Sequence, residues 1–314
     1  MLVIVAPGQG AQSPGMLNPW LELDGVADRL RGWQDAAGID LVHYGTEASA
    51  EEIKDTAVAQ PLLVATGLMT ARELFPDEAA ARRTVGAVAG HSVGEITAAA
   101  GAGVLDAADA LTFVRERGRA MAAAAAVTET GMVAVLGGDP EEVAAKLAEH
   151  GLVAANNNGG GQLVAAGRLD ALEALKADPP AKAKLVALKV AGAFHTEFMA
   201  PGVERLAELA PSLKVADPQV RYLSNKDGAL VSTGAEVISR LVAQVANPVR
   251  WDLCMETIAG LGATCVIELA PAGTLTALVK RNIKGVVTLA VKTPADLDKA
   301  RELIAEHGTE EATA

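Results

Sequence analysis

Apolar runs alternate with amphipathic stretches along most of the chain, and this alternation predicts strands separated by helices. The run at residues 1–6 ends at Pro7-Gly8 and predicts a buried first strand, and the run at residues 85–89 precedes two helical stretches. Further strands are predicted at residues 220–224, 266–269 and 286–291, with helical stretches between them. Strands and helices in alternation indicate an α/β domain with a parallel sheet.

The pattern changes between residues 127 and 192. The predicted elements there are a strand at 132–136, a helix from Asp139 with Pro140 at its first position, strands at 152–155 and 162–166, a helix around 169–176 and a strand at 185–190. This order is the split βαβ, or ferredoxin-like, arrangement. We therefore expect a ferredoxin-like subdomain at residues 127–192, inserted into a discontinuous catalytic domain of residues 1–126 and 193–314.

Composition excludes several classes of protein. A chain of 314 residues is long enough for a self-supporting core without disulfides. Cys254 and Cys265 lack the spacing of a disulfide framework or a metal knuckle, so we interpret both as core thiols and expect no metal. Such cysteine usage fits a reducing compartment, the cytoplasm.

Charge and hydropathy restrict the partners of the chain. Twenty-seven Lys and Arg against 39 Asp and Glu give a formal net charge of -12, which opposes binding to nucleic acid or to an anionic membrane. No apolar run approaches the ~20 residues of a membrane span, and residues 1–6 lack the basic start of a signal peptide. An acidic partner would need a local basic patch.

The pentapeptide Gly90-His91-Ser92-Val93-Gly94 follows the apolar run at residues 85–89 and precedes a helical stretch. A serine in this context forms a nucleophile elbow, where small neighbours admit a tight turn and helix amides face developing negative charge. We interpret Ser92 as a nucleophile and the Val93 N–H as an oxyanion donor. The alternative is a glycine-rich turn with an incidental serine, and the pentapeptide alone does not define the reaction.

A serine nucleophile needs a base, and His195 is the candidate among the five histidines. It follows Gly192-Ala193-Phe194, between a predicted strand and a helix, where a side chain can reach a cleft. The alternative is an ordinary histidine at a helix start. A third group should fix the imidazole tautomer, and a carboxylate and a carbonyl are equally plausible.

Arg117 falls on a helical stripe that is otherwise apolar and includes Val114 and Met121. No carboxylate lies three or four residues away from it, whereas Arg119 can pair with Glu116. A buried guanidinium without a partner is costly. Arg117 is therefore either half of a structural pair with a distant acid or a bidentate clamp for a substrate carboxylate.

The turn at residues 7–12, Pro-Gly-Gln-Gly-Ala-Gln, follows the first predicted strand. Ser13 stands where a dinucleotide-binding G-x-G-x-x-G needs its last glycine, and no Walker lysine follows. Ligands bind at the carboxyl ends of strands in open α/β sheets, so the backbone amides of this turn can face an oxyanion. A plain turn is the alternative.

Five segments together resemble the malonyl-CoA:acyl carrier protein transacylases, and the similarity covers nearly the whole chain. They are the turn at residues 7–12, the elbow at 90–95, Arg117 with Met121, Gly192-Ala193-Phe194-His195, and Gln244-Val-Ala-Asn-Pro-Val-Arg-Trp251. The departures are modest: Ala11 where the family often has serine, and residues 271–273 where a Pro-Gly turn is usual. The family implies an α/β-hydrolase-like large domain, a ferredoxin-like small one and a Ser-His dyad.

The resemblance also implies roles for individual residues in acyl transfer. It makes Ser92 the nucleophile, His195 the base, Arg117 the carboxylate clamp, Gln9 and Val93 the backbone oxyanion donors, Gln244 the residue that orients His195 through its carbonyl, and Met121 part of the substrate site. Phe194 matches the malonyl-selecting pattern, in which the aromatic ring fills the space of an α-methyl branch.

The function implied by the resemblance is transfer of a malonyl group from malonyl-CoA to the phosphopantetheine thiol of acyl carrier protein, through a malonyl-serine intermediate. No bound cofactor is expected, and the free-standing length suggests a component of fatty-acid or type II polyketide synthesis. Lys182, Lys184 and Lys189 are candidates for a basic patch that meets the acidic carrier protein. The alternatives are a serine thioesterase or esterase and a carrier-binding scaffold without activity.

Overall fold

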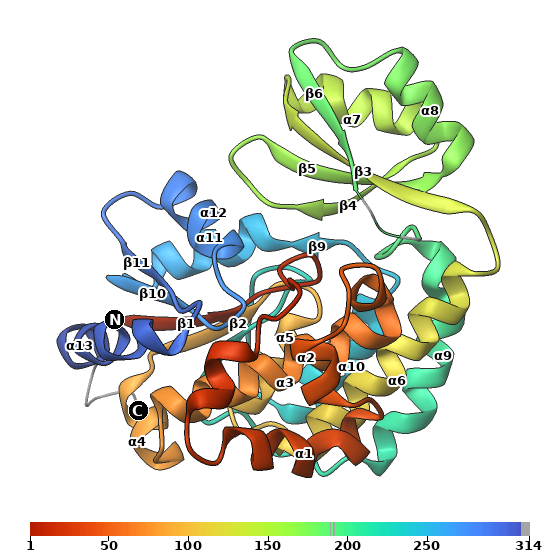
Figure 1. Ribbon diagram of the computed structural model, residues 1–314. Coiled ribbons are helices and arrows are strands. Elements are labelled where there is room, and N and C mark those ends of the chain that lie inside the picture. The colour runs from red at the N-terminus through yellow and green to blue at the C-terminus, as the bar shows by residue number, and fades with distance from the viewer. Residues whose placement is uncertain (189, 191, 309–314) are drawn as a thin grey trace.

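The computed structural model describes residues 1–188, 190 and 192–308, and its strands form two sheets (Figure 1). The larger sheet has the order β11-β10-β1-β2-β7-β8. Its strands are β1 (Leu2–Ala6), β2 (Ala87–Gly90), β7 (Arg221–Leu223), β8 (Leu230–Val231), β10 (Cys265–Glu268) and β11 (Val287–Ala290). Neighbouring strands are parallel except for β7 and β8. Every strand predicted for the large domain is present, with its ends shifted by at most two residues.

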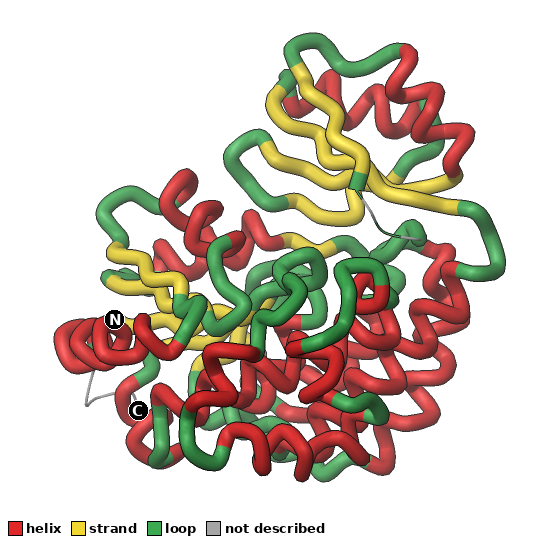
Figure 2. Tube along the Cα trace, in the orientation of Figure 1, coloured by secondary structure: helices red, strands yellow, loops and turns green. Residues whose placement is uncertain are grey.

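Helices cover both faces of the larger sheet (Figure 2). They are α1 (Val26–Ala37), α2 (Leu41–Thr46), α3 (Thr56–Leu74), α4 (Glu78–Thr84), α5 (Gly94–Gly101), α6 (Ala107–Ala125), α9 (Ala200–Leu209), α10 (Gly234–Gln244), α11 (Trp251–Gly260), α12 (Thr274–Asn282) and α13 (Leu297–His307). Successive β1 side chains point to opposite faces. Leu2 and Ile4 therefore pack in a core with α3, α5 and α6, whereas Val3 and Val5 pack in a second core with α11 and α12.

The smaller sheet forms a lobe of its own, at the top of Figure 1. Its order is β6-β3-β5-β4-β9, with β3 (Thr130–Gly137), β4 (Val153–Asn157), β5 (Gln162–Arg168), β6 (Ala183–Ala187) and β9 (Val249–Arg250), and its helices are α7 (Pro140–Glu149) and α8 (Leu169–Ala177). The first four strands pair antiparallel in the order of a ferredoxin-like fold. The predicted fold class is thereby confirmed.

One strand of the small lobe was not predicted. β9 comes from a distant part of the chain and pairs parallel with β4 at two positions, Asn156 with Val249 and Asn157 with Arg250. A strand of two residues is too short to show a period of two, so the sequence pattern carries no signal for it. The domain boundaries at residues 126 and 193 stay a prediction.

Helix α6 carries Arg117 and begins after Asp106. The Asp106 carboxylate accepts a hydrogen bond from Asp109 N–H at 2.8 Å and caps the helix. α6 packs along α3, and this contact turns Arg117 into the interior, where it is 1% exposed. Among the helices of the described residues, none combines the length and the hydropathy needed to cross a membrane.

Gly90 leaves no room for a side chain, and substitution there tests the packing of the turn after β2. A Cβ added at Gly90 would lie 2.0 Å from the Gly94 carbonyl carbon. Because backbone cannot move aside as a flexible side chain can, Gly90→Ala should lower the free energy of unfolding by about 1–3 kcal/mol. Urea unfolding measures the change.

The control for this substitution is Gly101→Ala at the end of α5. Nothing lies within 4 Å of a Cβ added there, so the variant should keep its stability or gain up to about 1 kcal/mol. Equal unfolding midpoints for the Gly90 and Gly101 variants would contradict the steric argument.

Candidate active site

Ser92 lies on the turn between β2 and α5. Its φ of 52° is in the left-handed region, which costs a residue with a side chain about 1–2 kcal/mol. Asn225, in the loop after β7, holds this conformation. Its Oδ1 accepts a hydrogen bond from Ser92 N–H at 2.7 Å, and its Nδ2 donates to Gly90 O at 2.7 Å. The predicted elbow is thus present and is fixed from outside its own segment.

His195 also has a left-handed backbone, with a φ of 63°, and it is 3% exposed. Its Nε2 lies 2.7 Å from Ser92 Oγ, and its Nδ1 lies 2.8 Å from the main-chain oxygen of Gln244. A carbonyl oxygen can only accept, so Nδ1 carries the proton and Nε2 is left to accept the proton of the Ser92 hydroxyl. Of the two groups that could orient the imidazole, the structure contains the carbonyl.

The guanidinium of Arg117 reaches the serine from α6. Its Nη2 donates to Ser92 Oγ at 3.3 Å and to Gln244 Oε1 at 2.8 Å, and its Nη1 donates to Gln60 Oε1 at 2.6 Å. Burial lowers the pKa of Arg117 to about 10, so it stays charged at neutral pH. In the described part of the chain every direct partner of Arg117 is neutral, which leaves its charge available to an anionic group bound beside Ser92.

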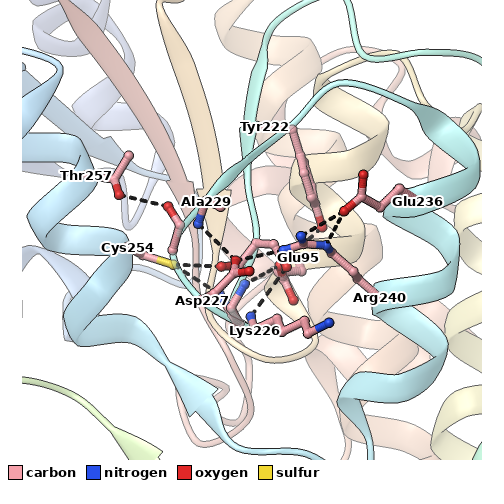
Figure 3. A network of polar contacts seen from close by, with 12 residues as sticks. Glu95, Tyr222, Lys226, Asp227, Ala229, Glu236, Arg240, Cys254 and Thr257 are labelled. Atoms are coloured by element: carbon pink, nitrogen blue, oxygen red, sulfur yellow. Dashed lines mark hydrogen bonds and ion pairs between the residues drawn. The ribbon is translucent and has the colours of Figure 1, made fainter.

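A buried carboxyl group, Glu95, lies behind the elbow on α5. Its Oε1 accepts hydrogen bonds from Asn225 N–H at 2.7 Å and from the Tyr222 hydroxyl at 3.3 Å, and its Oε2 accepts one from Gln244 Nε2. Figure 3 shows Glu95 and Tyr222 within one network of polar contacts. Burial raises the pKa of Glu95 to about 8. Glu95 and Arg117 are therefore joined through the side chain of Gln244.

The turn at residues 7–12 runs beside the elbow. A Cβ added at Gly8 would lie 2.8 Å from His91 O, so the two backbones are in contact. The N–H groups of Gln9 and Val93 donate no hydrogen bond to any residue that the structure describes. These are the two donors that the family resemblance assigns to the oxyanion, and both remain free to bind one.

Phe194 and Met121 are buried in the same hydrophobic core as α3 and α6. Gln60 Nε2 lies 3.4 Å from Met121 Sδ, so Gln60 contacts both Met121 and Arg117. The Arg119–Glu116 pair expected on the outer face of α6 is present at 3.3 Å.

Two of the candidate lysines, Lys182 and Lys184, have no hydrogen bond to the groups of the elbow among the described residues. Lys182 and Lys184 are exposed at the beginning of β6, in the small lobe. In the described residues neither has an ion-pair partner, and Lys189 lies outside those residues. The structure therefore does not bring Lys182 or Lys184 into the group formed by Ser92, His195, Arg117 and Gln244.

Four polar residues of the network were missed from the sequence: Gln60, Glu95, Tyr222 and Asn225. Gln60 and Glu95 each interrupt an apolar helical stretch, as Arg117 does. A polar residue at an otherwise apolar helical position is thus a signal that all three share. Asn225 directly follows a predicted strand, at the end where sites form in α/β sheets. Tyr222 lies within a strand and gave no signal.

A serine on a strand-to-helix elbow, a histidine at hydrogen-bond distance and two free backbone donors define the class: these are α/β enzymes that acylate a serine. The chain matches the family described as "Acyl transferase domain" over residues 3–305. It belongs to this family, and the resemblance inferred from its motifs is confirmed.

Named relatives are similar over almost their whole length. The "Malonyl CoA-acyl carrier protein transacylase" of Mycobacterium tuberculosis (strain ATCC 25618 / H37Rv) is 53% identical over 308 residues, which cover 96% of this chain and 100% of that protein. The protein of the same name from Mycolicibacterium smegmatis is 49% identical over 292 residues, covering 92% and 100%.

Solved structures show the same fold. A crystal structure of MCAT from Mycobacterium tuberculosis has a TM-score of 0.92 and 51% identity, and the match covers 96% of this chain and 99% of that one. An acyl-carrier-protein-S-malonyltransferase from Bartonella henselae has a TM-score of 0.90 and 29% identity, with coverage of 97% and 99%. The fold is thus shared with a protein of under one-third identity.

The pH dependence of serine acylation tests the protonation state of His195. Burial, followed by the positive charge of Arg117, lowers the pKa of His195 to about 3. Because the base must be neutral, acylation of Ser92 should not weaken as the pH falls through 6.5, the ordinary pKa of histidine. The measurement is kcat/KM of the first half-reaction between pH 5 and 8, which reports the free enzyme. An acid limb centred near pH 6.5 would contradict this expectation.

Proposed function

We propose that this protein transfers a malonyl group from malonyl-CoA to the phosphopantetheine thiol of acyl carrier protein. The observation that carries the proposal is the guanidinium of Arg117, which is buried among neutral partners 3.3 Å from Ser92 Oγ. A malonyl group on Ser92 has its carboxylate a few atoms from that oxygen, and a forked guanidinium can bind it with two hydrogen bonds. The names of the relatives support the same substrates.

In the first half-reaction, His195 Nε2 accepts the proton of Ser92 Oγ as this oxygen attacks the thioester carbonyl of malonyl-CoA. The oxyanion that forms accepts hydrogen bonds from the N–H groups of Gln9 and Val93, each worth roughly 2.7–4 kcal/mol by analogy with hydrolases. The C–S bond then breaks, and the departing CoA sulfur takes the proton from His195. The products are malonyl-Ser92 and CoA.

The second half-reaction uses the same groups in reverse. The carrier-protein thiol gives its proton to His195, and its sulfur attacks the ester carbonyl of malonyl-Ser92. The oxyanion forms again against the two N–H groups, the C–O bond breaks, and Ser92 Oγ recovers the proton from His195. The main-chain oxygen of Gln244 keeps the imidazole in one tautomer through both steps.

A serine thioesterase or esterase would share Ser92 and His195 but would not need a buried cation beside the nucleophile. The position of Arg117 favours an acyl group that carries its own carboxylate. The proposed chemistry requires no bound cofactor, because CoA enters as part of the substrate.

We also propose the location and the domain division. Cys254 and Cys265 are free and buried, which suits the reducing cytoplasm.

Strands β3 to β6 all fall within residues 127–192, which supports a subdomain there and a catalytic domain of residues 1–126 and 193–314.

Intact-protein mass spectrometry tests the proposed transfer. Malonyl-CoA alone should add one malonyl group, and carrier protein bearing its phosphopantetheine arm should remove it. Ser92→Ala should gain no malonyl group, whereas Ser13→Ala, at an exposed serine, should react as the unmodified protein does. Release of free malonate in place of transfer would favour a thioesterase, and the absence of any adduct would favour a scaffold without activity.

The clamp is tested by acyl groups that differ in their carboxylate. Arg117→Ala should reduce malonyl transfer about a hundredfold, because it removes charge-assisted hydrogen bonds worth about 1.5–3 kcal/mol each, and should spare acetyl transfer by comparison. Arg117→Lys should recover only part of the loss, since an ammonium cannot form the fork. If acetyl and malonyl transfer fall equally, Arg117 has a structural role only.

The basic patch is tested by charge reversal. Lys182→Glu combined with Lys184→Glu should raise the KM for carrier protein, most at low ionic strength, because steering is screened over about 8 Å at physiological salt. Reaction with malonyl-CoA should change less. Lys299→Glu with Arg301→Glu, on α13, is the control of equal charge. Carrier-protein kinetics that match the unmodified protein at low salt would exclude Lys182 and Lys184 from the docking surface.

A further inference from the structure

Two buried ionisable groups of opposite charge are connected through one amide. Gln244 accepts a hydrogen bond from Arg117 Nη2 through its Oε1 and donates one to Glu95 through its Nε2. Arg117 and Glu95 are each 1% exposed, and Gln244 is 5% exposed. Charges in such poorly hydrated surroundings interact across distances at which water would screen them. The pKa of Glu95 therefore depends on the net charge of Arg117 together with any anion bound to it.

The amide of Gln244 has a fixed direction. Its Nε2 faces three oxygen acceptors, which belong to Glu95, to the Ser92 main chain at 3.2 Å and to Asn225 Oδ1 at 3.4 Å. Turning the amide over would place its NH2 group against the guanidinium and its oxygen against these acceptors. Gln244 therefore presents its oxygen to Arg117 and its NH2 group to Glu95. The two ionisable groups interact electrostatically through this amide, and no proton passes between them.

Building on the proposed function, we propose that Glu95 takes up a proton from solvent when a malonyl carboxylate binds Arg117. In the empty site one cation faces one acid, so the guanidinium favours the carboxylate form of Glu95. A malonyl carboxylate adds a second negative charge beside the same cation. Two buried anions sharing one cation repel each other, and the one without direct contact to the guanidinium becomes protonated. The Tyr222 hydroxyl donates a hydrogen bond to Glu95 Oε1 at 3.3 Å, which favours the carboxylate form in the empty site.

The groups that face Glu95 from the elements packed around it do not titrate in the same range. Burial raises the pKa of Tyr222, on β7, and of Cys254, on α11, well above their ordinary values. The pKa of His195 is lowered to about 3 and that of Arg117 to about 10, and the Asp227–Arg240 ion pair at 2.7 Å remains charged.

Glu95 itself loses its proton as the pH rises through about 8, because burial raises its pKa to that value. Below this pH Glu95 already holds the proton in the empty enzyme, so malonyl binding takes up little. Above it Glu95 is ionised, and malonyl binding takes up as much as one proton. By linkage, the equilibrium constant for forming malonyl-Ser92, divided by that for forming acetyl-Ser92, should fall with rising pH, by up to about tenfold per unit.

The experiment measures proton uptake with an indicator dye at pH 8.5 while the protein is acylated with malonyl-CoA or with acetyl-CoA. Release of CoA contributes equally to both reactions, so their difference isolates the effect of the carboxylate. The unmodified protein should take up more protons with malonyl-CoA, and Glu95→Gln should abolish the difference. Intact mass spectrometry of the same samples counts acylated serines and gives the malonyl and acetyl equilibria between pH 7 and 9.

A second variant covers the case in which Glu95→Gln fails to fold. Tyr222→Phe removes a hydrogen bond that favours the ionised carboxylate, so the onset of uptake should move to higher pH. Equal uptake with malonyl-CoA and acetyl-CoA, or a pH-independent ratio of the malonyl and acetyl equilibrium constants, would overturn the role of Glu95 and leave the proposed function standing. Absence of a malonyl adduct on Ser92 would overturn both.

Discussion

The positive charge of Arg117, buried beside Ser92, determines how the polar groups of this site are arranged. A guanidinium withdrawn from water needs oxygen acceptors, and the amides of Gln60 and Gln244 supply them without cancelling its charge. Burial, followed by the same positive charge, lowers the pKa of His195 and keeps its imidazole neutral. The only acid joined to this network among the described residues, Glu95, is held one amide away. Arg117 thus affects two properties of the site: the affinity for an anion bound beside Ser92, and the pKa of His195.

Ser92 and His195 both have backbone in the left-handed region, Ser92 at a φ of 52° and His195 at 63°. Such backbone persists only where surrounding contacts determine it. The Asn225 side chain accepts a hydrogen bond from Ser92 N–H and donates one to Gly90 O. The His195 N–H donates to Val245 O at 3.0 Å. These contacts come from the loop after β7 and from the segment after α10. The geometry of the dyad is therefore maintained by parts of the chain far from Ser92 in sequence.

The features that the sequence predicted are those that stand out against a regular background. Ser92 lies between glycines at a strand end, and Arg117 is a charge on an apolar stripe, so local patterns indicate both. The residue pattern alone could not choose the group that orients His195, because a main-chain carbonyl is present at every residue. Only the family resemblance indicated Gln244, whose main-chain oxygen lies 2.8 Å from His195 Nδ1. Asn225 reaches the elbow because β7 pairs with β2, a pairing that periodicity does not define. The fold class was predictable because strand order within the small lobe follows from its sequence of elements.

The pairing of β9 with β4 has a mechanical consequence. An inserted lobe attached only by its two connecting segments could rotate as a rigid body. In this protein β4 of the small lobe also pairs with β9, which follows Gln244 by a few residues. The segment from Gln244 to Arg250 thus has one end at the imidazole of His195 and the other in the sheet of the small lobe. Rotation of the lobe would either break the hydrogen bonds between β4 and β9 or displace the main-chain carbonyl of Gln244 that orients His195. The orientation of the small lobe and the alignment of the His195 imidazole are consequently linked through residues 244–250.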